Sequence, residues 1–382
     1  MRVLFMFMKN IFSAFVISLF LLISTIFAQT EETIRVGVFV DMTGQTASFG
    51  ISTFSAIKMA ADEINANGGI NGRKIELFLE DNQGQPENTK TVVTKLINET
   101  MVHALLGEVL STNSLVAAPI AQAAKIPMIT PSSTNTRVTK IGDYIFRTCF
   151  IDELQGEAMA KFAFENLRFK RIAVLTDFNS DYAKGLSETF AVTFNRLGGK
   201  IVAQKTYFQG DEDYFQQLQA IKKVNPDAIY LTGYYNAVGV IAKQAREMKI
   251  NVPFLGGDGW DSPSLFQLSD NSLNNSYITD HFSLQTPSEK VKKFSTNYKK
   301  LFGLAPDAFA ALAYDAMYVL ADSVKRANST DRQRLREAIA ATKDFEGVTG
   351  KITINSARNA DKPVIIQKLQ NPYFIYHSTI QP

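Results

Sequence analysis

The sequence predicts an α/β protein made of two lobes, each a parallel β-sheet flanked by helices. Apolar strand-like runs alternate with amphipathic helical stretches, and strands joined by helices lie parallel with right-handed crossovers. The chain has 382 residues, more than one typical domain. The pattern also restarts after Phe150. Each half has a helix that ends in Gly-Gly, at 68–69 and 198–199, and an apolar strand that turns at an aspartate, Asp41 or Asp177.

The first half contains five expected strands joined by helices. Each helix carries its apolar residues on one stripe. The first helix ends at Asn67-Gly68-Gly69, where glycine supplies the left-handed conformation of a helix C-terminus. The expected strands are 34–40, 74–80, 102–107, 126–130 and 144–150, and the expected helices are 51–66, 87–98 and 113–124.

The second half repeats this rhythm and then departs from it. Beyond residue 276 the last strands follow one another too closely for helical crossovers, which indicates antiparallel additions or a hinge region. The expected strands are 171–176, 200–208, 228–232, 253–255, 276–282, 351–354, 364–369 and 373–377. The expected helices are 153–166, 182–197, 214–224, 237–248, 288–302, 308–327 and 331–341.

The first 28 residues have the pattern of a cleavable secretory signal peptide. Arg2 and Lys9 precede an apolar run over 11–27, and Ala28 is a small residue at a plausible cleavage point. Met8 is an alternative start of translation. An uncleaved membrane anchor is the other reading, because the run only just reaches spanning length. We expect a protein exported to the periplasm.

Composition narrows the class of protein. With 46% hydrophobic and 20% charged residues the chain is globular, and a formal charge of +3 without a basic block does not favour nucleic-acid binding. Cys149 is the single cysteine, so an intramolecular disulfide is excluded, and we expect a buried, inert thiol. The sequence has no cysteine near the cleavage point, so we expect no lipid anchor at the mature N-terminus.

Catalytic and metal-binding signatures do not stand out. His103, His281 and His377 are far apart in the sequence, without metal-ligand spacing, and we interpret all three as structural. The sequence has no nucleophile elbow and no P-loop, and its Gly-Gly pairs follow helices rather than strands. We therefore expect no catalytic residue, no metal and no cofactor.

Polar and aromatic residues gather just past the strand ends. Ligands of α/β proteins bind outside these carboxyl ends, so the residues should line one cleft between the lobes. Hydroxyls and N–H groups suit a carboxylate, and Asp258 suits an ammonium, so a zwitterion fits. Taken alone, the turn at 131–135 also has the composition of an ordinary surface turn. The polar segments are 108–113, 131–135, 177–182, 233–236 and 256–258.

These motifs resemble the solute-binding proteins of branched-chain amino-acid ABC transporters, the leucine/isoleucine/valine-binding group with the type I periplasmic binding fold. The resemblance covers residues 33–382. It rests on Thr43-Gly44 with Phe49-Gly50, the turn at 62–72, Pro127-Met128-Ile129-Thr130-Pro131, Phe146-Arg147-Thr148, Tyr182 with Gly185, Gly233-Tyr234 and Tyr314-Asp315-Ala316.

The resemblance implies a ligand site shared by both lobes. Ser111 with Ser132, Ser133 and Thr134 would hold the α-carboxylate, and Asp258 with Thr134 would hold the α-ammonium. The side-chain pocket would be walled by Phe49, Tyr182, Tyr234 and Tyr314. The sequence departs from better-known members in having Asp258 where they have glutamate, and Gly84 and Leu110 where some carry a disulfide.

The resemblance also implies a division into lobes joined by three hinge crossovers. The signal peptide covers 1–28, one lobe covers 33–150 plus 281–346, and the other covers 151–280 plus 347–382. The implied function is capture of an amino acid by lobe closure, as a monomer, and its delivery to an inner-membrane ABC permease. The alternatives are a sensor of the same fold for amides, urea or aromatic acids, and a secreted α/β enzyme with Asp258 or Glu108 as a base.

Overall fold

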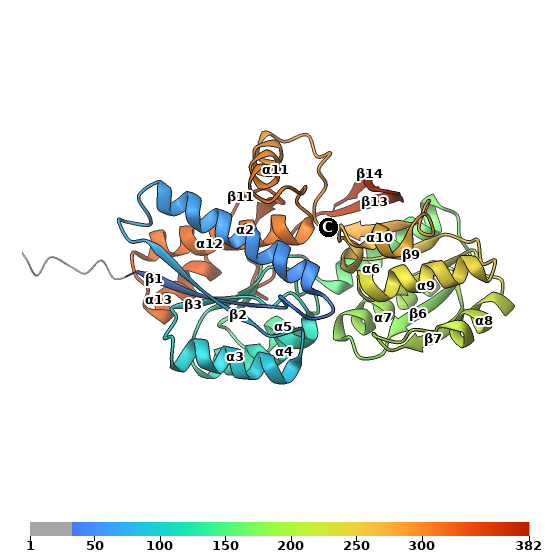
Figure 1. Cartoon of the computed structure of the whole chain (residues 1–382), viewed down its shortest axis with the longest axis horizontal. Helices are drawn as coiled ribbons and strands as arrows, with labels where there is room; N and C mark the ends of the chain where they lie inside the picture. The colour runs from blue at the N-terminus through green and yellow to red at the C-terminus, as the bar shows by residue number, and fades with distance from the viewer. Residues whose placement is uncertain (1–32, 382) are drawn as a thin grey trace, which may run out of the picture.

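The computed structural model describes residues 33–381 and has two α/β bodies side by side (Figure 1). The first is built on a five-stranded sheet in the order β2-β1-β3-β4-β5, and its strands pair in parallel. These strands are Ile34–Val40 (β1), Ile75–Asp81 (β2), Ala104–Leu106 (β3), Met128–Thr130 (β4) and Ile145–Arg147 (β5).

The second body has a seven-stranded sheet in the order β14-β13-β10-β9-β8-β6-β7. Strands β6 to β10 pair in parallel, and β13 and β14 are added antiparallel at one edge. Its strands are Arg171–Asp177 (β6), Lys200–Tyr207 (β7), Ala228–Thr232 (β8), Phe254–Gly256 (β9), Tyr277–Asp280 (β10), Val364–Gln370 (β13) and Tyr373–Ile380 (β14). A separate hairpin joins Phe345–Gly347 (β11) to Gly350–Ile352 (β12).

Helices cover the sheets, as strand–helix alternation requires. Around the first sheet, α12 packs along α2 although the two are far apart in sequence (Figure 1). The helices of this body are Ala47–Ala66 (α2), Pro86–Asn98 (α3), Ser111–Ala123 (α4), Arg137–Lys140 (α5), Glu289–Phe302 (α11), Ala308–Ala327 (α12) and Arg332–Ala340 (α13). Those of the second body are Asp152–Lys161 (α6), Asp181–Arg196 (α7), Phe215–Lys223 (α8), Tyr235–Glu247 (α9) and Leu265–Ser269 (α10).

The predicted α/β class is confirmed, and so are the antiparallel strands near the C-terminus. Several element bounds differ from the sequence prediction. Helix α2 begins at Ala47, four residues early, because Gly50 lets its first turn approach the end of β1: a Cβ at Gly50 would lie 1.8 Å from Asp41 O. The short elements α5, α10 and β11 were not predicted, since three to five residues carry too little periodicity.

The chain passes between the two bodies three times, after β5, after β10 and before β13. Buried polar contacts tie two of these crossovers together. Lys362 Nζ donates to Thr148 O at 3.2 Å and to the hydroxyl of Thr349, and Asp315 accepts the backbone N–H of Val348 and Thr349 at 2.7 and 2.9 Å.

Within 33–381 no helix is long and apolar enough to cross a membrane. The predicted signal peptide lies outside the described residues.

Candidate functional site

Two loops at the carboxyl ends of β3 and β4 form one side of the site. The carbonyl oxygen of Glu108 accepts hydrogen bonds from Thr130 Oγ1 at 2.6 Å and from Ser133 Oγ at 2.9 Å. Ser132 Oγ lies 3.5 Å from the carbonyl oxygen of Val109. Because adjacent parallel strands end at the same edge, these contacts hold the two loops as one surface.

A buried arginine fixes the shape of the 131–135 turn. The Arg147 guanidinium, at the end of β5, donates to Ser133 O at 2.6 Å, to Asn135 O at 2.8 Å and to Thr139 Oγ1 at 3.3 Å. The Arg147 side chain is fully buried, and burial lowers its pKa. Its donors bind two backbone carbonyls and one hydroxyl, which fixes the backbone of the turn for ligand contact.

The predicted carboxylate-binding residues lie together at this edge. Ser111 is the first residue of α4, where free backbone N–H groups and the helix dipole favour an anion, and its Oγ accepts the backbone N–H of Asn135 at 3.2 Å. Ser132, Ser133 and Thr134 are at most 3% exposed. Thr134 Oγ1 is buried and forms no hydrogen bond with the described part of the chain.

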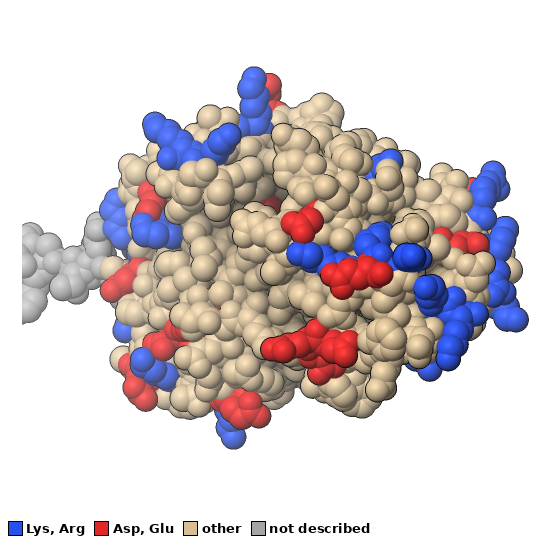
Figure 2. Space-filling view, turned by 45° about the vertical axis from the view of Figure 1, so that its right-hand side comes forward, with Lys and Arg blue, Asp and Glu red and all other residues tan. Residues whose placement is uncertain are grey.

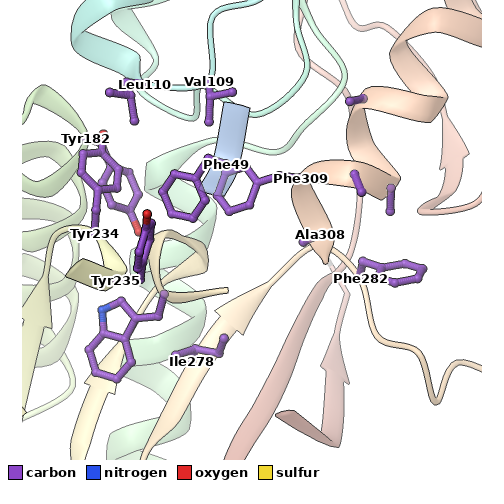
Figure 3. Close-up of a cluster of buried hydrophobic side chains, with 14 of the residues drawn as sticks. Phe49, Val109, Leu110, Tyr182, Tyr234, Tyr235, Ile278, Phe282, Ala308 and Phe309 are labelled. Carbon is purple, nitrogen blue, oxygen red and sulfur yellow. The ribbon is translucent and has the colours of Figure 1, made fainter. Parts of the chain in front are cut away.

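Aromatic rings from both bodies form the wall beside these loops (Figure 3). Phe49, in the first turn of α2, is 1% exposed, and its ring stacks on Phe309 at 4.0 Å. The rings of Tyr182 and Tyr234 stack at 5.4 Å, and the Tyr234 ring meets Phe49 edge-on at 5.9 Å. Tyr182 Oη accepts the N–H of Gly259 at 3.1 Å, which anchors the ring at the wall.

Asp258 lies just past β9, at the start of a single 3-10 turn, and is 3% exposed. Its Oδ2 lies 3.2 Å from Nε2 of His281, whereas its Oδ1 is buried without a hydrogen-bond partner in residues 33–381. Burial lowers the pKa of His281, which favours the neutral imidazole. The sequence pattern favours a structural role for His281 and does not reveal its place beside Asp258.

Tyr314 is the one predicted site residue that the structure does not bring together with the others. Its hydroxyl donates to Glu63 Oε2 at 2.5 Å, and its ring packs against Phe294 and Tyr318 on the outer side of α12. Phe309 occupies the wall instead (Figure 3). The two residues are five positions apart, which places them about 140° apart around the helix.

Tyr235, in the predicted cleft segment 233–236, packs edge-on against Phe49 at 4.9 Å. The structure also places residues at the site that the sequence did not indicate. The hydroxyl of Tyr230 is buried in the described structure without a partner. Asp152, at the start of α6, is 1% exposed. Phe309 and Asp152 had local signals, an apolar residue opening a helix and an acid in a first turn, but both patterns are common in ordinary helices.

The two bodies touch on both sides of the site, so the structure is closed over it. Thr112 and Asn135 of the first body contact Asp181 of the second, and Ser48 Oγ lies 2.8 Å from Ser262 Oγ. A polar cavity of about 430 Å³ at the rim, between the bodies, is lined by Leu110 and Tyr234 of the site together with Asp41, Gln83, Asp177 and Gln209, among others.

The described structure gives little support for a metal site or a reactive thiol. Residues 33–381 contain no cluster of three or more His, Cys, Asp or Glu side chains that could hold a metal ion. Cys149 is buried, and burial raises the pKa of its thiol to about 12. On the face shown in Figure 2, Lys and Arg are interspersed with Asp and Glu among broad neutral areas.

The sequence matches one protein family and is similar to several known binding proteins. A family model described as periplasmic binding protein matches residues 33–371. The Leu/Ile/Val-binding protein BraC3 of Rhizobium johnstonii is 28% identical, covering 84% of this chain and 87% of that protein. The leucine-, isoleucine-, valine-, threonine- and alanine-binding protein of Pseudomonas aeruginosa is 27% identical, with 85% and 87% covered.

Solved structures agree over most of the chain. The leucine-binding protein LivK of Thermotoga maritima is 37% identical with a TM-score of 0.88, covering 92% of this chain and 99% of that one. LivJ of Streptococcus pneumoniae, solved with isoleucine, is 34% identical with a TM-score of 0.88, covering 92% and 100%. A solute-binding protein of Rhodopseudomonas palustris with 3,4-dihydroxybenzoic acid is 28% identical, has a TM-score of 0.84 and covers 92% and 98%. These neighbours confirm the predicted fold.

Proposed function

The chain belongs to the periplasmic binding protein family, and on that premise we propose that it captures an aliphatic amino acid between its lobes and delivers it to an ABC permease. The relatives named above for leucine, isoleucine and valine support these three as first candidates. Each ligand has a carboxylate, an ammonium and a compact apolar side chain. The site offers a separate surface for each of these groups.

The ligand carboxylate would lie against the first lobe. The hydroxyls of Ser132 and Ser133 donate to the carbonyl oxygens of Val109 and Glu108 and fix the shape of the turn. Ser111, at the N-terminus of α4 where backbone N–H groups are free, and Thr134 in the turn present donors to the ligand. Charge-assisted hydrogen bonds of this kind are about twice as strong as neutral ones. The free Thr134 hydroxyl is a donor available to the ligand.

The observation that carries the proposal is the unpartnered Oδ1 of buried Asp258. A buried carboxylate oxygen without a partner is costly, and a ligand ammonium would remove that cost. Asp258 belongs to the second body and the serine turn to the first. A zwitterion would therefore bridge the two and favour the closed form by its differential affinity.

The side-chain wall matches an apolar group. Phe49, Phe309 and Tyr234 present ring faces and edges, and the Tyr182 ring is anchored because its hydroxyl accepts the N–H of Gly259. An aliphatic side chain gains about 25 cal/mol for each Å² of apolar surface that the rings cover. Leucine, isoleucine and valine meet this requirement without leaving a ligand polar group buried and unpaired.

Export by the leader at 1–28 would bring the mature protein to the periplasm, where it would work as a monomer with a permease. Catalysis is not part of the proposal, because no nucleophile, base and orienting group come together in the described site.

A ligand panel with two matched variants tests the proposal. Thermal shift and calorimetry of residues 29–382 should show stabilisation by leucine, isoleucine or valine. Asp258→Asn should abolish that response with the fold intact, whereas Asp62→Asn, in an exposed pair with Lys58, should leave it unchanged. The panel includes aromatic acids and amides. Stabilisation by those compounds alone, or an unchanged response in Asp258→Asn, would contradict the proposal.

A further inference from the structure

His281 lies between the hinge and the ammonium end of the proposed site. It follows β10 directly, at the second crossover between the bodies, and is 3% exposed. Its ring stacks on the ring of Phe150, at the first crossover, with the centroids 3.6 Å apart and the planes 26° apart. Its backbone N–H donates to Asp280 Oδ1 at 2.7 Å. The ring stack and the backbone contact together fix where the two ring nitrogens point.

The two ring nitrogens of His281 have different surroundings. Nε2 lies 3.2 Å from Asp258 Oδ2, and both side chains are buried. Nδ1 is buried and has no hydrogen-bond partner in residues 33–381. A neutral imidazole carries its proton on one nitrogen and a lone pair on the other. A proton on Nδ1 would leave a buried donor unpaired and turn the Nε2 lone pair toward a carboxylate oxygen, so the contacts favour the Nε2–H form.

The neutral ring is also favoured over the imidazolium. Burial lowers the pKa of His281 and outweighs the hydrogen bond and charge of Asp258, which raise it, and the charge of Lys362 on the third crossover lowers it too. An imidazolium would in addition bury a charged Nδ1–H donor without a partner. The other titratable groups near Asp258 are acids, phenols and one thiol: Cys149, Asp152, Asp261, Asp280, Tyr182, Tyr230 and Tyr234. The negative charge of Asp258 therefore remains available to a ligand cation.

We propose that His281 is the positioning residue of the ammonium site: its neutral imidazole donates Nε2–H to Oδ2 of Asp258 and so keeps Oδ1 free and directed at the ligand. This inference rests on the proposed function and assigns to it a residue that does not touch the ligand. Asp258 begins a single 3-10 turn, and its free Oδ1 has no other contact to hold its direction. Because the imidazole is stacked at the hinge, it sets that direction before the ligand arrives.

A neutral donor gives the site a different selectivity from a charged one. The neutral imidazole leaves the His281–Asp258 pair with one net negative charge, which attracts an ammonium and repels a ligand that has only a carboxylate. An imidazolium would make the pair neutral overall, and the site would lose much of this discrimination. Since the discrimination depends on the direction of Oδ1, removal of the imidazole donor should weaken the binding of ligands that carry an ammonium.

Two substitutions at His281 separate positioning from packing. His281→Phe keeps a ring to stack on Phe150 and removes the donor, whereas His281→Gln keeps an N–H donor of similar reach. Competition calorimetry compares L-leucine with 4-methylpentanoic acid, which is leucine without the amino group. In His281→Phe the affinity for leucine should fall by about 10-fold, while the affinity for the deaminated acid should not fall. His281→Gln should recover most of the lost affinity, and His377→Phe, the same change at an exposed histidine, should match the wild type.

Three binding results would overturn the inference. Unchanged leucine affinity in His281→Phe would show that the donor is not needed. An equal loss for both ligands would indicate that the ring only packs, and so would an equal loss of leucine affinity in His281→Phe and His281→Gln.

A spectrum of the wild-type protein is a second test, which needs neither a folded His281 variant nor a ligand. Nitrogen NMR of protein labelled with ¹⁵N-histidine distinguishes protonated from unprotonated ring nitrogens. The chain has three histidines, so variants of the other two assign the signals. At pH 7.5 His281 should carry a proton on Nε2 alone, and a proton on Nδ1 or on both nitrogens would refute the inference. All these refutations leave leucine binding by the wild type intact, whereas a wild type that binds no amino acid refutes the proposed function.

Discussion

Arg137 and Asp181 join the two lobes at the rim of the closed site. Nη1 of Arg137, on α5, lies 2.9 Å from Oδ1 of Asp181, the first residue of α7. Thr112 Oγ1 donates to Asp181 Oδ2 at 3.1 Å and accepts the backbone N–H of Asp181 at 3.1 Å. These groups come from different bodies, so the contacts form only when the lobes meet.

We expect Asp181→Ala to speed ligand release. The Arg137 side chain is 66% exposed, so the ion pair is screened, and the change should raise the release rate by roughly 2- to 5-fold. The association rate should change little, since the contacts form after the ligand binds. Stopped-flow release at low and high salt measures this, with Asp62→Ala as the control. An unchanged release rate would show that this contact does not hold the lobes closed.

Phe309 and Tyr314 on α12 should have separable effects. Phe309→Leu removes the ring that stacks on Phe49, and we expect the affinity for an aliphatic amino acid to fall by about 2- to 10-fold. Tyr314→Phe removes the hydrogen bond to Glu63, which should lower the free energy of unfolding by about 1 kcal/mol without changing affinity. Calorimetry and urea unfolding distinguish the two. Loss of affinity in Tyr314→Phe alone would reverse the assignment.

The sequence predicted the fold better than it predicted which face of a helix lines the site. Strands β1 and β6 follow directly from their apolar runs, and the polar segments after β3, β4 and β9 do lie together. The position of Tyr314 and the role of Phe309 could not be predicted, because α12 buries residues over much of its circumference and packing alone decides which of them meets Phe49. Asp152 was missed because acids are common in first turns and only its missing partners set it apart.

Arg147→Lys should be costly although it keeps the charge. A lysine cannot donate at the same time to the carbonyls of Ser133 and Asn135 in the geometry of a guanidinium fork. Leaving a buried carbonyl unpaired costs about 1–3 kcal/mol of unfolding free energy. We also expect weaker ligand binding, because the 131–135 turn loses its support. Urea unfolding with Arg196→Lys, an exposed arginine, as the control tests this. Equal stability of the two variants would contradict it.

Three aspartates where the lobes meet should make stability depend on pH. Asp261 Oδ2 accepts the N–H of Ala308 across the interface at 2.6 Å, and Asp280 and Asp307 are buried nearby. Burial, with the neighbouring carboxylates, raises the pKa of Asp261 to about 8, and burial raises that of Asp307 to about 6. Burial also raises the pKa of Asp280. No Lys or Arg of the described chain forms an ion pair with these three.

The sign of the effect follows from the raised values. The folded protein holds protons that the unfolded chain releases near its ordinary carboxyl pKa of about 4. The free energy of unfolding should therefore fall as pH rises from 5 to 8.5, by up to about 1.4 kcal/mol per pH unit for each proton. Asp261→Asn should flatten this profile. Unfolding between pH 5 and 8.5 measures it, and a stability that rises with pH through this range would contradict the account.

The most direct measurement of the central claim uses three ligands of one shape. L-Leucine has both charged ends, 4-methylpentanoic acid lacks the ammonium, and 3-methylbutylamine lacks the carboxylate. If the serine turn and Asp258 hold opposite ends of a zwitterion, calorimetry of the wild-type protein should show binding of leucine at least about 100-fold tighter than either analogue. Binding of 4-methylpentanoic acid as tightly as leucine would contradict the account.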